Sequence, residues 1–245
     1  MAMDRISRIN PLLEILRSSP QRVNKILIQK DSNKQDIAEI VRLSKLSHIS
    51  LQFVPKKRLD LLDKKHQGVV ALVMPKAFVS VDSILESAKL PFLLLLDGVV
   101  DPQNLGAIIR TAEGAGIDGL VLPERRAAGV TGAVASVSAG AVEHLKISRV
   151  TNLVRAMDDL RKRGVWLVGA EGGGQEYWYD FDYTVPLGLV LGSEGKGLRP
   201  LVKANCDRVL SIPLMGKLTS LNVAAAAAIF CFEVVRQRKK YLSKT

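Results

Sequence analysis

From Pro91 onward, the sequence alternates short apolar segments with longer amphipathic or alanine-rich segments, and this alternation constrains the fold more than any other feature. The short runs predict buried strands, whereas the longer segments have the apolar spacing of helices. Such alternation is typical of an α/β fold in which helices cover both faces of a mainly parallel sheet. The predicted strands are 92–96, 119–122, 165–169, 187–191 and 208–212, and the predicted helices are 104–115, 131–141, 151–163, 198–205 and 220–239.

The first third of the chain differs in composition. Residues 1–77 predict a small α/β domain, and residues 91–245 form the second predicted domain. Residues 78–90 lack a strong core pattern and predict a linker with one helical turn. Residues 1–77 carry +8 of the formal net charge of +11. A basic excess in one segment favours a polyanionic partner, because binding phosphates releases counterions. Nucleic acid is the first candidate partner, and an anionic membrane surface is the second.

Several classes of protein and site have no support in the sequence. Two cysteines, Cys206 and Cys231, are too few for a disulfide framework, and the longest apolar run, 223–232, is too short to cross a bilayer. The amino-terminal residues lack the apolar core of a signal peptide, so we expect a cytoplasmic protein without a membrane partner. The three histidines are scattered, which predicts no metal site. The P-loop, G-x-G-x-x-G and G-x-S-x-G patterns are absent.

Polar residues and glycines cluster after three of the predicted strands. The first cluster contains Asn104 and Arg110, the second is the glycine-rich segment around Glu194, and the third contains Ser220 and Asn222. Open α/β sheets bind ligands at the carboxyl ends of their strands, so we expect one shared site. Each cluster also has a structural interpretation, since Asn104 and Ser220 are suitable helix caps and a glycine-rich loop alone is weak evidence of binding.

Together, these clusters resemble the three motifs of the SpoU (TrmH-like) RNA ribose 2′-O-methyltransferases. They read N-L-G-A-I-I-R-T-A at 104–112, L-G-S-E-G-K-G-L at 191–198 and I-P-L-M-G-K-L-T-S-L-N-V-A at 212–224. The segment H-Q-G-V-V-A at 66–71 resembles the end of the L30e-like RNA-binding domain in the RlmB-type members. The resemblance therefore covers nearly the whole chain. It departs from that type at 8–11, where R-I-N-P replaces the usual glycine and histidine.

The resemblance implies a SPOUT fold with a deep trefoil knot, formed here by roughly residues 165–223, after an L30e-like domain. It also implies a homodimer with active sites at the subunit interface, and S-adenosylmethionine as cofactor. Methyl transfer from a sulfonium to a hydroxyl depends on positioning and electrostatics, so no metal is expected. The residues that the resemblance assigns to cofactor binding are Gly169, Leu191, Gly192, Ile212, Met215 and Leu221.

The catalytic residues that the resemblance implies are Asn104, Arg110, Glu194, Ser220 and Asn222. A guanidinium keeps its proton in proteins, so we expect Arg110 to stabilise the developing alkoxide and to hold a substrate phosphate rather than to act as a base. Glu194 is expected either to orient Arg110 or Asn222 or to contact the substrate directly.

The implied substrate is a guanosine of 23S ribosomal RNA, because the two-domain layout resembles the RlmB type. Three alternatives stay open. The first is a guanosine 2′-O-methyltransferase that acts on transfer RNA. The second is a catalytically silent RNA-binding factor in ribosome assembly, and the third is a small-molecule enzyme on an α/β scaffold. The last alternative leaves the basic first domain without a purpose.

Overall fold

The computed structural model describes residues 3–30, 35–174 and 176–242, which form two compact units. Unit 1 comprises the described residues up to Ala77 together with 129–144, and unit 2 comprises 78–128 and the described residues from Leu145 onward. The predicted domains differ from these units in two segments. Residues 129–144, predicted to lie in the second domain, are part of unit 1, and the predicted linker 78–90 is part of unit 2.

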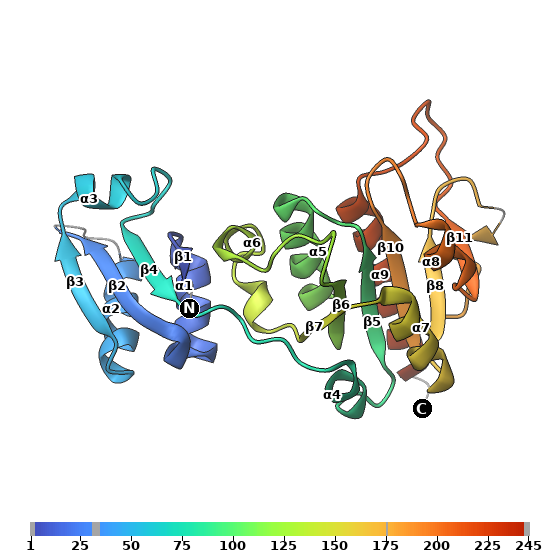
Figure 1. Cartoon of the computed structure of the whole chain (residues 1–245), viewed down its shortest axis with the longest axis horizontal. Coiled ribbons are helices and arrows are strands. Elements are labelled where there is room, and N and C mark those ends of the chain that lie inside the picture. Colours follow the sequence, from blue (N-terminus) through green and yellow to red (C-terminus); the bar gives the residue numbers. More distant parts are fainter. Residues whose placement is uncertain (1–2, 31–34, 175, 243–245) are drawn as a thin grey trace. The chain divides into compact units, whose positions relative to one another are not determined.

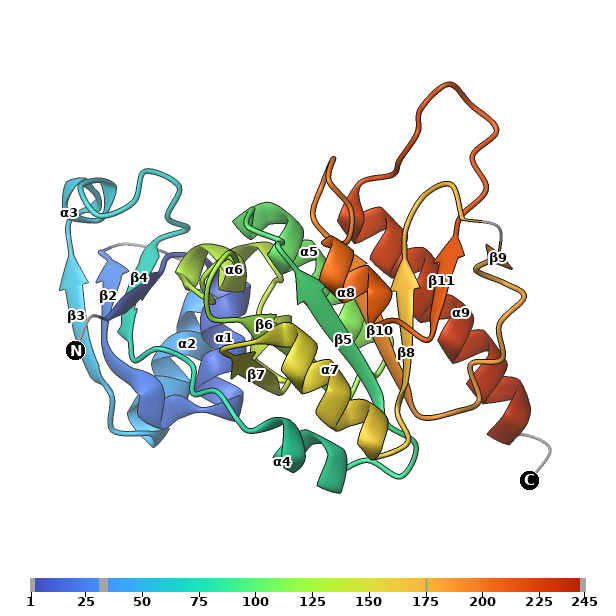
Figure 2. The same ribbon diagram turned by 45° about the vertical axis from the view of Figure 1, so that its right-hand side comes forward.

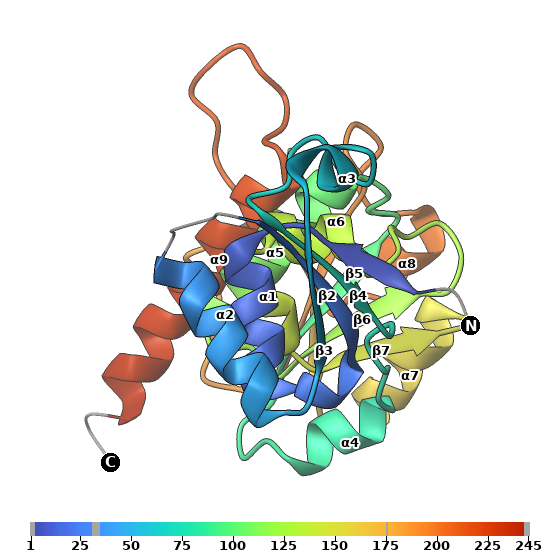
Figure 3. The same ribbon diagram turned by 90° about the vertical axis from the view of Figure 1, so that its left-hand side faces the viewer.

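Unit 1 has a four-stranded sheet in the order β1-β4-β2-β3, in which only β2 and β3 are parallel (Figure 3). Residues along β2 alternate between the two faces, so Ile26 and Ile28 are buried on one side and Leu27 packs with Leu59 of α3 on the other. The elements of unit 1 are β1 (Asp4–Ile6), α1 (Ile9–Ser18), η1 (Pro20–Arg22), β2 (Val23–Gln29), α2 (Gln35–Leu46), β3 (Ser50–Val54), α3 (Lys56–Asp60), β4 (Val69–Val73), α6 (Gly132–Val137) and η2 (Ala141–Glu143).

Close packing explains why residues 129–144 belong to unit 1. A Cβ atom on Gly132 would lie 2.0 Å from the carbonyl oxygen of Arg5, so α6 approaches β1 as closely as only glycine permits. The carboxylate of Glu143 is 2% exposed and pairs with Arg22. Separating such a buried pair is costly, because it leaves a charge without a partner.

Unit 2 has a seven-stranded sheet in the order β7-β6-β5-β10-β8-β11-β9, and every neighbouring pair is parallel. Helices α4, α7 and α8 cover one face, and α5 and α9 cover the other (Figures 1 and 2). The parallel sheet covered on both faces agrees with the predicted α/β class. The elements are α4 (Val81–Glu86), β5 (Phe92–Asp97), α5 (Pro102–Gly114), β6 (Gly119–Pro123), β7 (Ile147–Val150), α7 (Leu153–Lys162), β8 (Trp166–Ala170), β9 (Glu176–Tyr177), β10 (Leu187–Gly192), α8 (Pro200–Ala204), β11 (Arg208–Ser211) and α9 (Val223–Leu242).

The central strands of unit 2 agree with the sequence pattern, but three details differ. Residues 78–90 contain α4, whose Ile84 is fully buried in the same core cluster as Leu93. Strands β7 and β9 were not predicted. Helix α5 starts at Pro102, because Asp101 rather than Asn104 caps it. No described helix has the length and apolarity needed to span a bilayer, and the knot expected through residues 165–223 stays a prediction.

Candidate active site

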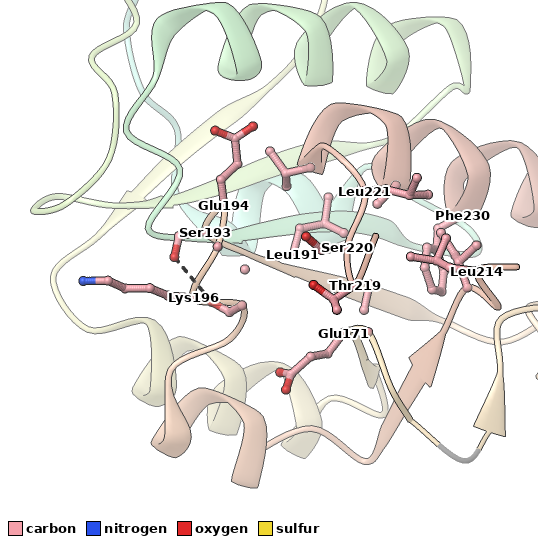
Figure 4. A pocket seen from close by; sticks show the side chains of 18 residues that line it. Glu171, Leu191, Ser193, Glu194, Lys196, Leu214, Thr219, Ser220, Leu221 and Phe230 are labelled. Atoms are coloured by element: carbon pink, nitrogen blue, oxygen red, sulfur yellow. Dashed lines mark hydrogen bonds between the residues drawn. The ribbon is translucent and has the colours of Figure 1, made fainter. Parts of the chain in front are cut away.

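The three motifs lie together at the carboxyl ends of β5, β10 and β11, as the sequence predicts. A cavity of about 290 Å³ lies between the glycine-rich turn after β10, the loop after β8 and the loop between β11 and α9. Leu191, Leu221 and Phe230 supply apolar walls, and a few carboxylates and hydroxyls supply the polar groups (Figure 4). Mostly apolar walls with a small number of polar groups are typical of sites for small ligands.

The glycine-rich motif forms a closed turn. The backbone N–H of Ser193 donates to the carbonyl of Gly197 (3.1 Å), and the N–H of Gly197 donates to the carbonyl of Ser193 (2.9 Å). Gly195 and Gly197 have φ angles of +73° and +63°, which other residues rarely adopt. A Cβ atom on Gly192 would lie 2.2 Å from the carbonyl carbon of Gly197, so the strand and the turn approach each other only because residue 192 is glycine.

A buried carboxylate holds the far end of this turn. Asp97 ends β5, and its side chain has no exposed surface. Its Oδ2 accepts from the backbone N–H of Arg199 (2.9 Å), and its Oδ1 accepts from Nε of the same residue (2.6 Å). A buried carboxylate requires such partners, so these contacts fix the start of α8 against β5. Sequence analysis gave Asp97 no role, since its partner lies 102 residues away.

One polar side chain from each motif enters a single hydrogen-bonded cluster. Nδ2 of Asn104 and Nδ2 of Asn222 each donate to Oε1 of Glu194 at 2.7 Å, and Nδ2 of Asn222 also donates to Oδ1 of Asn104 at 2.9 Å. Hydrogen bonds to a charged acceptor contribute about 1.5–3 kcal/mol each. The three motifs are therefore held in one arrangement. Glu194 contacts Asn222, one of its two predicted partners, and does not contact Arg110.

Asn222 has a second role as the cap of α9. Its Oδ1 accepts from the backbone N–H groups of Ala224 (2.9 Å) and Ala225 (3.3 Å). The sequence pattern predicted a start at Ser220, but the helix starts at Val223. The reason is that asparagine is favourable as a cap and unfavourable inside a helix. Ser220 lies in the preceding loop, where it lines the cavity beside Thr219 (Figure 4).

Glu171 is a polar group of the cavity that sequence analysis missed. It follows β8, and its Oε1 accepts from Nζ of Lys203 at 2.7 Å. Its Oε2 is buried and has no hydrogen-bond partner among the described residues. Leaving a buried acceptor unpaired costs about 1–3 kcal/mol, so a donor on a bound ligand would remove this cost. The sequence feature that could have identified Glu171 is its position between a predicted strand and the glycines of 172–174.

The structure separates the predicted site residues into three groups. Leu191, Gly192, Glu194, Ile212, Ser220 and Leu221 line the cavity. Asn104 and Asn222 do not line it but bind Glu194, which does. Gly169, Met215 and Arg110 lie outside both the cavity and this cluster.

Two of the predicted cofactor-binding residues have other surroundings. A Cβ atom on Gly169 would lie 2.8 Å from Cδ1 of Leu198 and 3.0 Å from Sγ of Cys206, so this glycine allows β8 to pack against the α8 segment. Met215 is 98% exposed. It belongs to the loop between β11 and α9, which projects beyond the other elements of unit 2 (Figure 1).

Arg110 lies on the exposed surface of α5 and makes no hydrogen bond or ion pair with any residue that the structure describes. It follows Asn104 by six positions, which places it roughly 120° around the helix axis from Asn104. Asn104 is buried against Glu194. Helix α5 therefore directs Arg110 away from the side of the helix that contacts Glu194.

Neither cysteine has the properties of a nucleophile. Burial is the main cause that raises the pKa of the Cys206 thiol to about 12, and the nearby carboxylate of Asp207 adds to this rise. Burial also raises the pKa of the Cys231 thiol to about 12. Across residues 3–30, 35–174 and 176–242, no three His, Cys, Asp or Glu side chains are grouped to hold a metal ion.

Two family models match the sequence. The SpoU rRNA Methylase family matches residues 91–232, and the model for RNA 2′-O ribose methyltransferase substrate binding matches residues 9–79. The Bacillus subtilis (strain 168) protein YacO, assigned to the TrmH family of tRNA/rRNA methyltransferases, is 41% identical over 234 residues, which cover 94% of each chain.

Solved structures align with this chain over almost its whole length or over about two thirds of it. The SpoU methyltransferase AviRb from Streptomyces viridochromogenes aligns with a TM-score of 0.83 and 28% identity, covering 98% of this chain and 91% of that one. The same enzyme in complex with the cofactor AdoMet (S-adenosylmethionine) aligns with a TM-score of 0.82 and 29% identity, covering 96% and 90%. The TrmH/SpoU tRNA modifying enzyme of A. aeolicus aligns over 64% of this chain and 80% of its own, with a TM-score of 0.57 and 28% identity.

Proposed function

Because the chain belongs to the SpoU rRNA methylase family, we propose that it transfers the methyl group of S-adenosylmethionine to the 2′-hydroxyl of a guanosine in 23S ribosomal RNA. The observation that carries this proposal is the cluster of Asn104, Glu194 and Asn222, which joins the three motifs beside the cavity. A protein that only binds RNA has no need of this cluster.

The residues of the cavity fit the proposed cofactor. S-adenosylmethionine supplies an electrophilic methyl group on a sulfonium sulfur, and its adenine, ribose and amino group offer hydrogen-bond donors. Leu191, Ile212 and Leu221 give apolar contact, Gly192 permits the close turn, and Oε2 of Glu171 accepts from a donor of the cofactor. AviRb, 29% identical to this chain, has been solved with this cofactor.

The hydrogen-bonded cluster prepares Glu194 for contact with the substrate. Its Oε1 is occupied by both asparagine side chains, while its Oε2 accepts no hydrogen bond from a described residue. We assign Oε2 to accept the hydrogen bond of the ribose 2′-hydroxyl, and the Ser220 hydroxyl to hold the ribose from the facing loop. A positioned acceptor of this kind aligns the hydroxyl for in-line attack and withdraws its proton as the new C–O bond forms.

The exposed position of Arg110 supports a homodimer in which this residue serves the cavity of the partner subunit. Helix α9 packs beside α5 and carries Phe232, which is 51% exposed and is a candidate contact for a second subunit. Arg110 would then stabilise the developing alkoxide of the other subunit's reaction. Mixing Arg110→Ala and Glu194→Ala subunits tests this arrangement. Restored methylation in the mixture is expected, and no restoration contradicts the shared site.

Ribosomal RNA is favoured over transfer RNA because residues 9–79 match a substrate-binding model for RNA 2′-O ribose methyltransferases, which gives the chain a two-domain layout. The relatives carry names that include both RNA classes, so methylation of a transfer RNA guanosine is the second candidate. The silent ribosome-assembly factor is the third. A cytoplasmic location follows from each of these functions and is proposed with them.

The decisive experiment incubates the purified protein with labelled S-adenosylmethionine and either unmodified 23S ribosomal RNA or unmodified transfer RNA, followed by nucleoside analysis. Label in 2′-O-methylguanosine from ribosomal RNA alone is the expected result. Label from transfer RNA alone retains the reaction and changes the substrate. RNA binding without methyl transfer to either RNA supports the silent factor.

A further inference from the structure

The arginines of unit 2 fall into two groups. Six are held by carboxylates or backbone carbonyls, namely Arg161, Arg163, Arg199, Arg208, Arg236 and Arg238. Five have guanidinium groups that make no hydrogen bond or ion pair with any described residue, and one of these is Arg110 on α5. The other four lie in one region of the sheet and are here called the arginine edge. The arginine edge consists of Arg125, Arg126, Arg149 and Arg155.

Strand pairing brings these four residues together. Strands β6 and β7 are parallel, with Pro123 opposite Val150, and the N–H of Glu124 donates to the carbonyl of Val150 at 2.9 Å. Arg125 and Arg126 follow directly, so they leave β6 beside the end of β7. Arg149 precedes Val150, and Arg155 lies in the first turn of α7, which begins three residues after β7. All four are exposed.

A cavity of about 510 Å³ beside α7 is lined by both Arg149 and Arg155. The acidic residues that line it are already neutralised, because Asp82 pairs with Arg163 and Asp159 pairs with Lys162. Neither of these carboxylates is therefore paired with Arg149 or Arg155. The guanidinium of Arg149 lies 4.8 Å from the centre of the Phe78 ring, a cation–π contact that restrains the side chain but leaves its donors unused.

The arginine edge and the active-site cavity lie at the same edge of the sheet. Both are at the carboxyl ends of the strands, with β7 and β10 separated by β6 and β5. Three strand spacings correspond to roughly 15 Å. A strand of RNA with its target ribose at the active site therefore reaches the arginine edge within a few nucleotides. Guanidinium groups suit this ligand, since their planar donors match the oxygens of a phosphate.

We propose that the arginine edge binds phosphates of the RNA strand that flanks the methylated nucleotide. The proposal rests on the proposed function, because it takes RNA as the substrate. It adds that unit 2 itself holds the substrate strand, whereas the charge distribution along the sequence directs attention to unit 1. Loss of these contacts is expected to weaken RNA binding without affecting cofactor binding.

The test compares two double variants of the full-length protein, Arg125→Gln with Arg126→Gln and Arg149→Gln with Arg155→Gln. A matched control, Lys89→Gln with Lys239→Gln, removes the same charge from two exposed residues, of which Lys89 precedes β5 at the opposite edge of the sheet. Affinity for in vitro transcribed 23S ribosomal RNA and for transfer RNA is measured from 50 to 200 mM salt. Affinity for S-adenosylmethionine and the unfolding temperature are measured without RNA.

The logarithm of RNA affinity falls linearly with the logarithm of the salt concentration, and each phosphate contact on a single strand contributes about 0.7 to the steepness of this slope. Each arginine double variant is therefore expected to have a slope that is shallower by about 1.4. The ratio of wild-type to variant RNA affinity then falls about sevenfold between 50 and 200 mM salt. Cofactor affinity and unfolding temperature stay at the wild-type values. The proposal is overturned if the arginine variants keep the slope of the lysine control on both RNAs. Because binding is measured separately from methylation, a protein that binds RNA through this edge without methylating it refutes only the proposed function.

Discussion

Replacing Gly192 by alanine tests whether the active-site cavity depends on the close approach of β10 to the turn that follows it. The added Cβ would lie 2.2 Å from the carbonyl carbon of Gly197 and 2.4 Å from the backbone nitrogen of Leu198. Both neighbours are backbone atoms, so no change of side-chain rotamer removes the clash. The turn must move by at least about 1 Å to restore ordinary van der Waals contact.

The expected cost follows from what the turn carries. Overpacking in a well-packed region typically costs about 1–3 kcal/mol. A displaced turn also moves Glu194 away from Asn104 and Asn222, whose hydrogen bonds to it are both 2.7 Å long. We expect most of the strain to be relieved by deforming the cavity rather than by unfolding unit 2. A loss of about 3 kcal/mol in binding corresponds to affinity for S-adenosylmethionine that is more than a hundredfold weaker.

The assay is isothermal titration of S-adenosylmethionine, together with thermal unfolding followed by circular dichroism. Gly216→Ala is the matched control, since it makes the same change in the loop between β11 and α9, where no atom lies within 4 Å of the new Cβ. The control is expected to bind within about twofold of the wild type. If Gly192→Ala also binds within about threefold, the cavity does not require this close approach and the reasoning fails.

Four further predictions concern carboxylates and thiols. Glu194→Gln keeps a carbonyl oxygen for both asparagines and is expected to retain more single-turnover methylation than Glu194→Ala, which should lose at least about a hundredfold; the reverse order contradicts the role of the cluster. Glu171→Leu should weaken S-adenosylmethionine binding about tenfold in titrations, whereas Lys203→Met, which removes only the half-exposed ion pair, should stay near the wild type. Iodoacetamide at pH 8 should leave Cys206 and Cys231 unmodified in the native protein, as mass spectrometry would detect, because both thiols have a pKa of about 12. Since unfolded thiols ionise near their ordinary pKa of 9.0, stability should fall as the pH rises above 9.

The central sheet of unit 2 was predictable, whereas its edges were not. Strands such as β5 and β10 are buried along their whole length and appear in the sequence as continuous apolar runs. Strand β7 has the sequence Ile-Ser-Arg-Val and an exposed arginine, so it has no such run. Helix α4 was expected only as one helical turn in a linker, because it is six residues long and buries one residue, Ile84, completely. Short elements are defined by their tertiary contacts, which local patterns do not contain.

The residues of the site were more predictable than their contacts. Parallel strands end at one edge of a sheet, which was sufficient to bring Asn104, Glu194 and Asn222 together. That Asn222 both caps α9 and donates to Glu194 was not predictable, because the choice between Ser220 and Asn222 as the cap depends on a partner 28 residues earlier in the chain. The burial of Oε2 of Glu171 was not predictable either, because it follows from tertiary packing that local patterns do not contain.

Arg110 shows how a motif differs from a site. Sequence similarity places Asn104 and Arg110 in the same nine-residue segment, which invites the conclusion that they act on the same bound molecule. Helical periodicity argues against that conclusion, since six positions turn the side chain roughly 120° away. The buried contact of Asn104 with Glu194 fixes the rotation of α5 about its own axis, and Arg110 is then directed outward. If both residues act in methyl transfer, they act from different sides of α5, which is the arrangement that the mixing of Arg110→Ala and Glu194→Ala subunits tests.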